Sequence, residues 1–259
     1  MKKTLPILID MDGLIRLGSL LAKDAAQLLN FLNDEKLPFF ILTNSTRESG
    51  NDIKNYLSRC GINFPVNAIT TVDATIEYLK EKKLTASVYC DKNVHSRFKN
   101  YINDDNPDAV VIGDLGTEWT YEILNRIFNQ VHNGAEIIAM QKNKFWKPDG
   151  IKLALDAGAF IAAVEFATGK TSTLIGKPSP VYFNTALKML GFNTGSPFLM
   201  IGDDIENDIN PAQKLGGKGI MVYTGKTRFP LAPDTKIQPD YASQNLTEVI
   251  DLLKDILSN

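Results

Sequence analysis

The chain has 259 residues, of which 44% are apolar and 22% are charged, and its formal net charge is −2. This length allows one large α/β domain or a core with a second, smaller domain, and the composition is that of a globular protein with an ample core. The nearly balanced charge gives no reason to expect nucleic acid or an anionic membrane as a partner. A phosphate-bearing ligand would therefore need a local positive site.

The cysteines and the first residues of the chain are typical of a protein in a reducing cellular compartment. Cys60 and Cys90 are too few for a disulfide framework and lack the spacing of a metal site, which fits a reducing environment. The apolar run after the basic start is too short for a signal peptide, and no segment approaches the ~20 apolar residues of a membrane span. We therefore expect a cytoplasmic enzyme or binding protein.

Strand-like and helical segments alternate along most of the chain, which predicts an α/β fold with a parallel sheet. In the first part, strands are expected at residues 5–9, 38–42 and 68–70, and helices at 23–35, 49–60 and 73–83. In the last part, strands are expected at 197–201 and 219–223, and helices at 181–190, 205–215 and 246–257.

Residues 82–174 have a strand–helix alternation of their own, which predicts an inserted α/β domain. Its strands are expected at residues 86–90, 109–112, 136–140 and 173–175, and its helices at 119–131 and 150–167. The flanking segments, residues 1–81 and 175–259, are then the two parts of a core domain with a Rossmann-like parallel sheet.

Two aspartates close the first apolar run, in which residues 5–9 are followed by Asp10, Met11, Asp12 and Gly13. Alternation along a buried strand sends Asp10 and Asp12 to the same side, at the strand end where open α/β sheets bind ligands. Burying two like charges is costly, and a divalent cation is a usual partner. A carboxylate can also act as a nucleophile and form an aspartyl-phosphate. The alternative interpretation is a plain strand followed by an Asp-Gly turn.

Polar groups follow two further predicted strands, which weakens that alternative. Thr43 and Asn44 follow the strand at residues 38–42, and the strand at residues 197–201 is followed by Gly202, Asp203, Asp204 and, further on, Asp208. Because the carboxyl ends of parallel strands lie at one edge, these groups can converge. Lys177 stands in a Gly-Lys-Pro turn directly before a helix, where it supplies a fixed positive charge. Carboxylates, a backbone carbonyl and waters would suit Mg²⁺, and phosphoryl transfer needs such positioned charges.

These residues, in this order, resemble the four motifs of the haloacid dehalogenase (HAD) superfamily phosphatases. The insertion between the second and third motifs is similar to the large C2-type cap of subfamily IIA. Within that subfamily, residues 142–147, 155–160, 176–180 and 201–204 resemble the branch of phospholysine phosphohistidine inorganic pyrophosphate phosphatase and HAD-like hydrolase domain-containing protein two. One departure is visible, because the first motif continues as Gly13-Leu14-Ile15-Arg16-Leu17, which affects the shape of the entrance rather than the chemistry.

The resemblance implies a role for each motif residue. Asp10 would attack phosphorus, and Asp12 would protonate the leaving oxygen and then activate water. Phosphoryl oxygens would be held by Thr43 and the amide of Asn44, and Lys177 would offset negative charge. Asp10, Asp203 and the backbone carbonyl of Asp12 would bind the metal. Asp208 would orient Lys177 or a metal-bound water. Asp204 would either bind the metal or support the residues that do.

The inserted domain is expected to read the substrate. Its segment from Gln141 to Lys147 contains three lysines and two aromatic residues, and we expect Lys144 and Trp146 to contact an anionic or planar leaving group. The alternative is a solvated basic loop whose aromatic side chains pack into the inserted domain. Related proteins often dimerise through the cap, so a homodimer is compatible with the resemblance, although no exposed apolar stripe in the sequence indicates one.

The sequence lacks complete motifs for a P-loop, a zinc site or a catalytic triad. The segments 167–171 and 223–227 end like a P-loop, but the required first glycine is replaced by Val164 and Ile220. The two histidines, His95 and His132, lack partners at zinc spacing or for a triad. The leading hypothesis is a Mg²⁺-dependent phosphatase acting on a small phosphorylated molecule. The alternatives are a phosphotransferase or mutase, which the sequence does not exclude, and an inactive HAD-fold binding protein, which need not keep this full set of charged residues.

Overall fold

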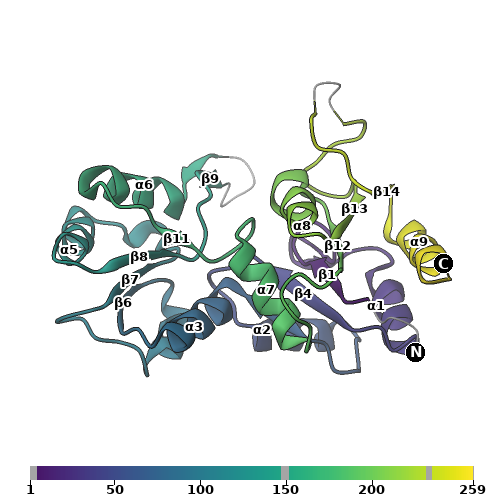
Figure 1. Cartoon of the computed structure of the whole chain (residues 1–259), viewed down its shortest axis with the longest axis horizontal. Helices are drawn as coiled ribbons and strands as arrows, with labels where there is room; N and C mark the ends of the chain where they lie inside the picture. The colour runs from purple at the N-terminus through teal and green to yellow at the C-terminus, as the bar shows by residue number, and fades with distance from the viewer. Residues whose placement is uncertain (1–4, 147–151, 232–234, 259) are drawn as a thin grey trace. The chain divides into compact units, whose positions relative to one another are not determined.

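The computed structural model describes residues 5–146, 152–231 and 235–258, with the side chain of Trp146 outside the described set (Figure 1). The chain divides into two compact units. The first contains residues 1–43, 50–69 and 177–259, and the second contains residues 44–49 and 70–176. No helix among the described residues is long and apolar enough to span a membrane.

The first unit is built on a six-stranded sheet with the order β14-β13-β12-β1-β4-β5. Its strands are β1 (Ile7–Asp10), β4 (Phe39–Thr43), β5 (Ala68–Thr70), β12 (Leu199–Gly202), β13 (Lys218–Val222) and β14 (Tyr241–Ser243). The central strand β1 pairs in parallel with both neighbours, and Ile9 lies level with Ile201 on one side and Ile41 on the other. All four residues of β1 are buried, as expected for a strand covered on both faces of a parallel sheet.

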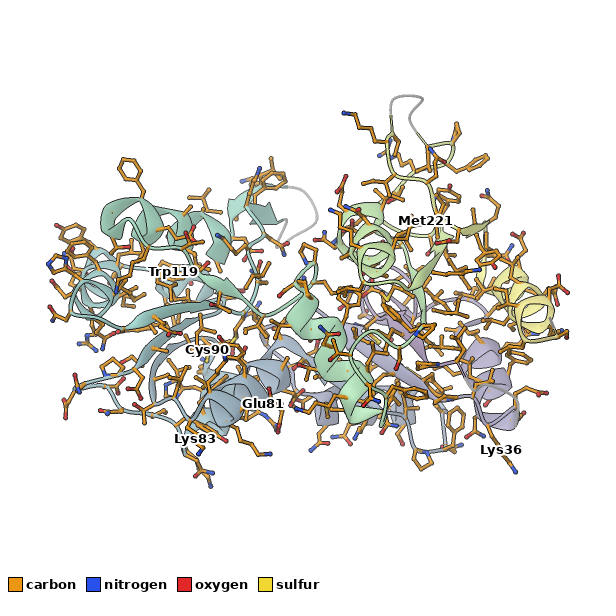
Figure 2. All side chains as sticks on the ribbon, viewed as in Figure 1. Lys36, Glu81, Lys83, Cys90, Trp119 and Met221 are labelled. Atoms are coloured by element: carbon orange, nitrogen blue, oxygen red, sulfur yellow. The ribbon has the colours of Figure 1, made fainter. Side chains whose placement is uncertain are left out.

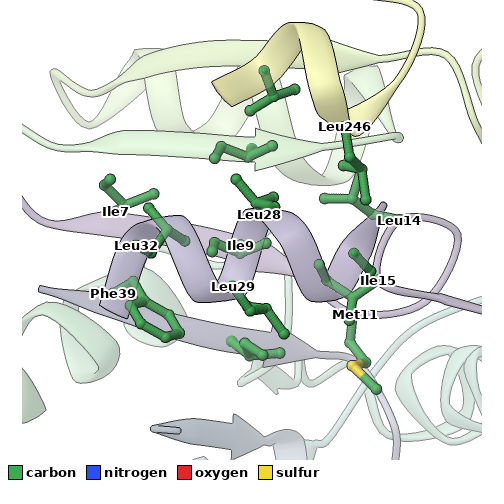
Figure 3. Close-up of a cluster of buried hydrophobic side chains, with 14 of the residues drawn as sticks. Ile7, Ile9, Met11, Leu14, Ile15, Leu28, Leu29, Leu32, Phe39 and Leu246 are labelled. Atoms are coloured by element: carbon green, nitrogen blue, oxygen red, sulfur yellow. The ribbon is translucent and has the colours of Figure 1, made fainter. Parts of the chain in front are cut away.

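Helices cover this sheet on both faces. They are α1 (Ala25–Asp34), α2 (Gly50–Arg59), α7 (Pro180–Met189), α8 (Asn210–Lys214) and α9 (Leu246–Ser258). One face carries an apolar cluster in which Leu28, Leu29 and Leu32 of α1 pack with the side chains of Ile7 and Ile9 (Figure 3). Burial of this many aliphatic groups, at about 25 cal/mol per Å² of apolar surface, is the main stabilising contribution to the unit. A short antiparallel hairpin, β2 (Arg16–Leu17) and β3 (Leu20–Leu21), follows β1.

The second unit has its own parallel sheet, with the strand order β11-β8-β7-β6. Its strands are β6 (Ala86–Tyr89), β7 (Ala109–Ile112), β8 (Glu136–Ala139) and β11 (Thr173–Leu174), and β9 (Phe145–Trp146) pairs separately with β10 (Ala154–Leu155). Its helices are α3 (Thr71–Lys82), α4 (Lys92–His95), α5 (Tyr121–His132) and α6 (Ala157–Thr168). Trp119 stacks on Phe160 at 4.3 Å between ring centroids, and Cys90 is buried in this unit (Figure 2).

The α/β class with parallel sheets is confirmed, but two predicted helices are wrong in part. The single helix expected at residues 205–215 is a π-helical turn, Ile205–Ile209, followed by α8, because Pro211 lacks the N–H of a continuous α-helix. The helix expected from residue 150 begins at Ala157, where Asp156 caps it by accepting from the Ala157 N–H at 2.7 Å. Residues 150 and 151 lie outside the described residues, and the hairpins β2–β3 and β9–β10, strand β14 and helix α4 were not anticipated.

Candidate active site

Asp10 ends the central strand of the first sheet, and its side chain is almost fully buried there. The ammonium of Lys177 contacts Asp10 Oδ1 and also donates to Asp208 Oδ1 at 2.7 Å. Lys177 is itself 5% exposed, so the three charged groups share a buried pocket of the fold. Since Lys177 precedes Pro178 and the capping residue Ser179 of α7, its backbone is held at the start of a helix.

The charges of these three groups are coupled. Burial raises the pKa of Asp10 to about 7, and the Lys177 ammonium opposes part of the rise. Burial and the neighbouring Asp10 charge likewise raise the pKa of Asp208 to about 7, again against the effect of Lys177. Burial by itself lowers the pKa of Lys177, but the two carboxylates outweigh it and raise the pKa above its usual range. Lys177 therefore stays a cation, and its charge limits the rise in the pKa of the two buried acids.

Asp203 follows β12 and is completely buried. Its Oδ2 accepts from the backbone N–H of Lys226 at 2.7 Å, whereas its Oδ1 has no hydrogen-bond partner among the described residues. Burial raises the pKa of this carboxyl. A buried carboxylate oxygen without a partner is costly, which indicates that another group completes it.

A divalent cation fits that position. One carboxylate oxygen from each of Asp10, Asp203 and Asp208 lies within 4.8 Å of the others. Oxygen ligands of this kind suit Mg²⁺, which needs only one or two carboxylates and keeps several waters. Asp208 accepts from Lys177 through Oδ1 and from the Asp204 N–H through Oδ2, so its two oxygens are already used. The donor set that fits the ion is therefore Asp203 with Asp10.

The side chain of Asp12, unlike those of the buried cluster, is exposed. Its carboxylate is 48% exposed, and it accepts from Thr43 Oγ1 at 2.6 Å and from Arg16 Nε at 2.8 Å. The expectation that Asp10 and Asp12 are buried together as like charges is wrong, because β1 ends at Asp10 and the chain turns before Asp12. The side chain of Asp12 is not among the clustered carboxylates, so any contribution from it to a metal site would come from its backbone.

Thr43 is the last residue of β4, and a neighbouring tyrosine fixes its backbone. Tyr182, fully buried in α7, donates to the carbonyls of Thr43 at 2.5 Å and Ile69 at 2.9 Å, and its oxygen accepts from the Thr43 N–H at 3.2 Å. One phenol thus joins the ends of β4 and β5 to α7. Asn44 directly follows Thr43 but belongs to the second unit, and its side-chain oxygen lies against Gly176.

Asp204 makes its hydrogen bonds within the loop after β12 and with Lys226. It caps the π-helical turn by accepting from the N–H groups of Glu206 at 3.0 Å and Asn207 at 3.1 Å, and the ammonium of Lys226 lies 3.0 Å from its Oδ2. Burial alone would raise the pKa of Asp204, but Lys226 and the donors of Asn207 outweigh it, and the pKa is lowered. Of the two roles left open for Asp204, these contacts favour support over metal ligation.

The residues of the segment that contains the predicted substrate-contacting Lys144 and Trp146 differ in their surroundings within the second unit. Lys142 is held by both carboxylate oxygens of Glu165 at 2.8 Å. Lys144 is exposed, and Phe145 in β9 is 58% exposed. The backbone of Trp146 pairs with Ala154, and its side chain lies outside the described residues, as does the whole of Lys147.

The comparisons with known proteins agree with this arrangement. The family model described as haloacid dehalogenase-like hydrolase matches residues 7–101, and a second model, described as HAD-hydrolase-like, matches residues 174–249. Haloacid dehalogenase-like hydrolase domain-containing protein 2 from Bos taurus is 33% identical over 90% of this chain and 88% of that protein. The chain belongs to the haloacid dehalogenase-like hydrolase family. The resemblance drawn from the sequence motifs is thereby confirmed, and the chain is an enzyme of the hydrolase class.

Two further relatives of this HAD-like hydrolase are informative. Phospholysine phosphohistidine inorganic pyrophosphate phosphatase from Mus musculus is 30% identical over 95% of this chain and 93% of that protein. The solved structure of a 4-nitrophenylphosphatase from Thermotoga maritima superposes with a TM-score of 0.84 at 25% identity, covering 96% of this chain and 97% of that one. The Thermotoga maritima structure thus shares its fold with the HAD-like hydrolase over almost the whole chain.

Sequence reasoning missed three contributors to the site of this HAD-like hydrolase. Arg16 was noted only as a departure from the first motif, yet it pairs with Asp12. Tyr182 had no signal beyond its place three residues after the capping Ser179. The segment containing Gly225 and Lys226 does not complete a P-loop, but as a polar run directly after a predicted strand it is a usable signal of a site residue.

Proposed function

We propose that this HAD-like phosphatase hydrolyses a phosphate ester or phosphoanhydride of a small molecule through an aspartyl-phosphate on Asp10, with Mg²⁺ as cofactor. The observation that carries the proposal is the buried ammonium of Lys177 between Asp10 and Asp208, beside the unpartnered oxygen of Asp203. Phosphoryl transfer depends mainly on positioned charge, and this cluster supplies fixed charges of both signs.

In the first half of the reaction, a carboxylate oxygen of Asp10 attacks phosphorus, and the bond from phosphorus to the leaving oxygen breaks. Asp12 gives its proton to that oxygen, a role that suits its exposed carboxylate. Lys177 offsets the negative charge of Asp10 and of the transferring group. Asp10, Asp203 and the backbone carbonyl of Asp12 would hold Mg²⁺, which supplies positive charge against the phosphoryl oxygens when bound.

In the second half, the Asp12 carboxylate takes a proton from water, and the water oxygen attacks phosphorus. The bond between phosphorus and Asp10 breaks, which releases inorganic phosphate and regenerates both aspartates. The Asn44 amide would hold a phosphoryl oxygen during both steps, and the Thr43 hydroxyl would do the same by turning its single donor hydrogen from Asp12 to the phosphoryl group. Asp208 and Asp204 support the site, the first through Lys177 and the second through the loop after β12.

The inserted segment, residues 82–174, would be the C2-type cap on a HAD core of residues 1–81 and 175–259. Lys144 and Trp146 of the cap are the residues that we assign to recognition of the leaving group. The name of the Mus musculus relative specifies phospholysine, phosphohistidine and inorganic pyrophosphate, so phosphoamino acids and pyrophosphate are worth testing as substrates here.

The test is phosphate release from p-nitrophenyl phosphate, pyrophosphate, phosphoamino acids and sugar phosphates, with Mg²⁺ or with EDTA. Wild type and Asp10→Asn are compared after circular dichroism has shown that both are folded. Release that needs Mg²⁺ and is lost in Asp10→Asn supports the proposal, and radiolabelled phosphate trapped on wild type but not on the variant identifies Asp10 as the phosphorylated residue. Full activity of Asp10→Asn would exclude Asp10 as the nucleophile. A phosphorylated product that appears only with an added acceptor would indicate a phosphotransferase.

A further inference from the structure

The segment after β13, residues 224–227, contacts Asp203 and Gly13 although the proposed mechanism does not use it. It follows the strand that carries Met221 (Figure 2). The Lys226 N–H donates to Asp203 Oδ2 at 2.7 Å, and the Thr227 N–H donates to the Asp203 carbonyl at 3.0 Å. One turn of chain thus holds both the side chain and the backbone of Asp203.

The same segment also holds the loop after β1. Thr224 Oγ1 donates to the carbonyl of Gly13 at 2.8 Å. This bond joins the ends of β1 and β13, which are not neighbours in the sheet because β12 lies between them. Asp203, at the end of β12, therefore lies between two segments that are tied to each other.

Two glycines enclose the Asp203 carboxylate. A Cβ added to Gly225 would overlap Asp203 Oδ2 and lie 3.0 Å from the Gly13 carbonyl oxygen. A Cβ added to Gly13 would overlap the same carboxylate, and the positive φ of Gly13, 98°, also favours glycine. With backbone packed on both sides and one oxygen hydrogen-bonded, the carboxylate has a single orientation, in which Oδ1 has no partner among the described residues.

We propose that residues 224–227 are a positioning clamp, which orients the Asp203 carboxylate so that its Oδ1 is presented to the divalent cation. The inference rests on the proposed function in that it assigns Asp203 to a Mg²⁺ site. The clamp holds Asp203 through its backbone, because the Lys226 N–H and not the Lys226 side chain donates to the Asp203 carboxylate, while that side chain is 67% exposed and pairs with Asp204. Groups that orient a metal ligand typically change metal affinity by about 10–100-fold when they are lost.

The test is direct Mg²⁺ binding, measured by isothermal titration calorimetry on the metal-free full chain. Gly225→Ala places a methyl group against the Asp203 carboxylate, and we expect the Kd for Mg²⁺ to rise by about 10–100-fold. Gly217→Ala is the matched control, because its methyl group crowds the Phe198 ring at 2.6 Å in the same unit and does not meet a carboxylate. We expect Gly217→Ala to lower the melting temperature and to keep the wild-type Kd.

Each outcome of the titration has a defined meaning. A folded Gly225→Ala that binds Mg²⁺ with the wild-type Kd would overturn the clamp. If Gly225→Ala does not fold, Thr224→Val decides, because it removes only the hydroxyl that donates to Gly13; a several-fold rise in Kd supports the clamp and an unchanged Kd overturns it. A wild-type protein that binds no Mg²⁺ would overturn the metal site of the proposed function itself, which separates that failure from failure of the clamp.

Discussion

Arg16 and Asp12 form an ion pair at 2.8 Å across the turn after the first strand, while Thr43 donates to the other oxygen of the same carboxylate. Arg16 also lies over the Tyr56 ring, 5.3 Å from its centroid, so the guanidinium is held on two sides. Asp12 is consequently fixed at the end of the sheet in one orientation and yet remains 48% exposed. A carboxylate that is both positioned and accessible is suited to exchange protons with a bound substrate.

We expect Asp12→Asn to discriminate between leaving groups. An alkyl phosphate needs protonation of its leaving oxygen, whereas p-nitrophenolate leaves without it, so kcat/KM should fall by about 10²–10⁴-fold for the alkyl ester and much less for p-nitrophenyl phosphate. Steady-state kinetics on both substrates would measure this. Asp34→Asn, an exposed change at the end of α1, is the control, and equal losses on both substrates would contradict the acid role.

Lys177→Met should destabilise the metal-free protein strongly. It leaves Asp10 and Asp208 buried without their cation, and breaking a buried pair typically costs about 3–5 kcal/mol. Urea denaturation at pH 8, above the pKa of about 7 that both carboxyls have in the wild type, measures the loss. Lys254→Met removes an exposed pair with Asp251 and should change the free energy of unfolding by less than about 0.5 kcal/mol. A Lys177→Met variant as stable as that control would refute the buried charge arrangement.

The free energy of unfolding of the metal-free protein should depend on pH through the titration of Asp10. Burial raises its pKa from 3.8 to about 7, so between these values the folded state binds more protons than the unfolded state. The stabilisation is therefore present at low pH and is lost as pH rises through about 7. In Asp10→Asn this contribution is absent. The slope of the free energy of unfolding against pH should therefore be smaller than in wild type by up to about 1.4 kcal/mol per pH unit. The measurement is chemical denaturation of both proteins at several pH values between 4 and 8, with EDTA. If the pKa of Asp10 were not raised, the free energy of unfolding would change with pH by the same slope in wild type and Asp10→Asn.

Tyr182→Phe should cost stability without removing packing volume. The hydroxyl satisfies buried carbonyls at the ends of β4 and β5, and loss of such a group costs about 1–3 kcal/mol. Chemical denaturation measures the cost, and Tyr121→Phe, at a site that is 75% exposed, should be nearly neutral. If both variants unfold at the same denaturant concentration as wild type, Tyr182 does not support Thr43.

Lys144→Ala and Lys142→Ala are a matched pair for the cap. Lys142 is bound to Glu165, so its replacement should lower the melting temperature and leave the ranking of substrates unchanged. Lys144 is exposed, and its replacement should change that ranking with little effect on melting. The measurement is kcat/KM over the substrate panel together with thermal unfolding. A uniform loss on every substrate would count against recognition by Lys144.

Most of the elements of the two main sheets, and the polar residues at their ends, could be predicted from the sequence. An apolar run such as residues 5–9 predicts a buried strand, observed as Ile7–Asp10, and the parallel direction of the sheet places the aspartates at the end of such runs at one edge. The family likewise followed from four short motifs in order. Local signals of this kind are readable because hydrophobic periodicity and turn residues act over a few positions.

Which charges meet, and how they are held, depends on contacts between residues that are far apart in the chain. Lys177 and Asp208 are 31 positions apart, Thr43 and Tyr182 are 139 positions apart, and Gly13 and Thr224 are 211 positions apart. The same holds for Asp10 and Asp12, which are two residues apart in the chain but differ in burial because the strand ends between them. Such contacts depend on strand order and on the packing of loops, which no local pattern encodes, and the free energy of a buried charge depends on those distant partners.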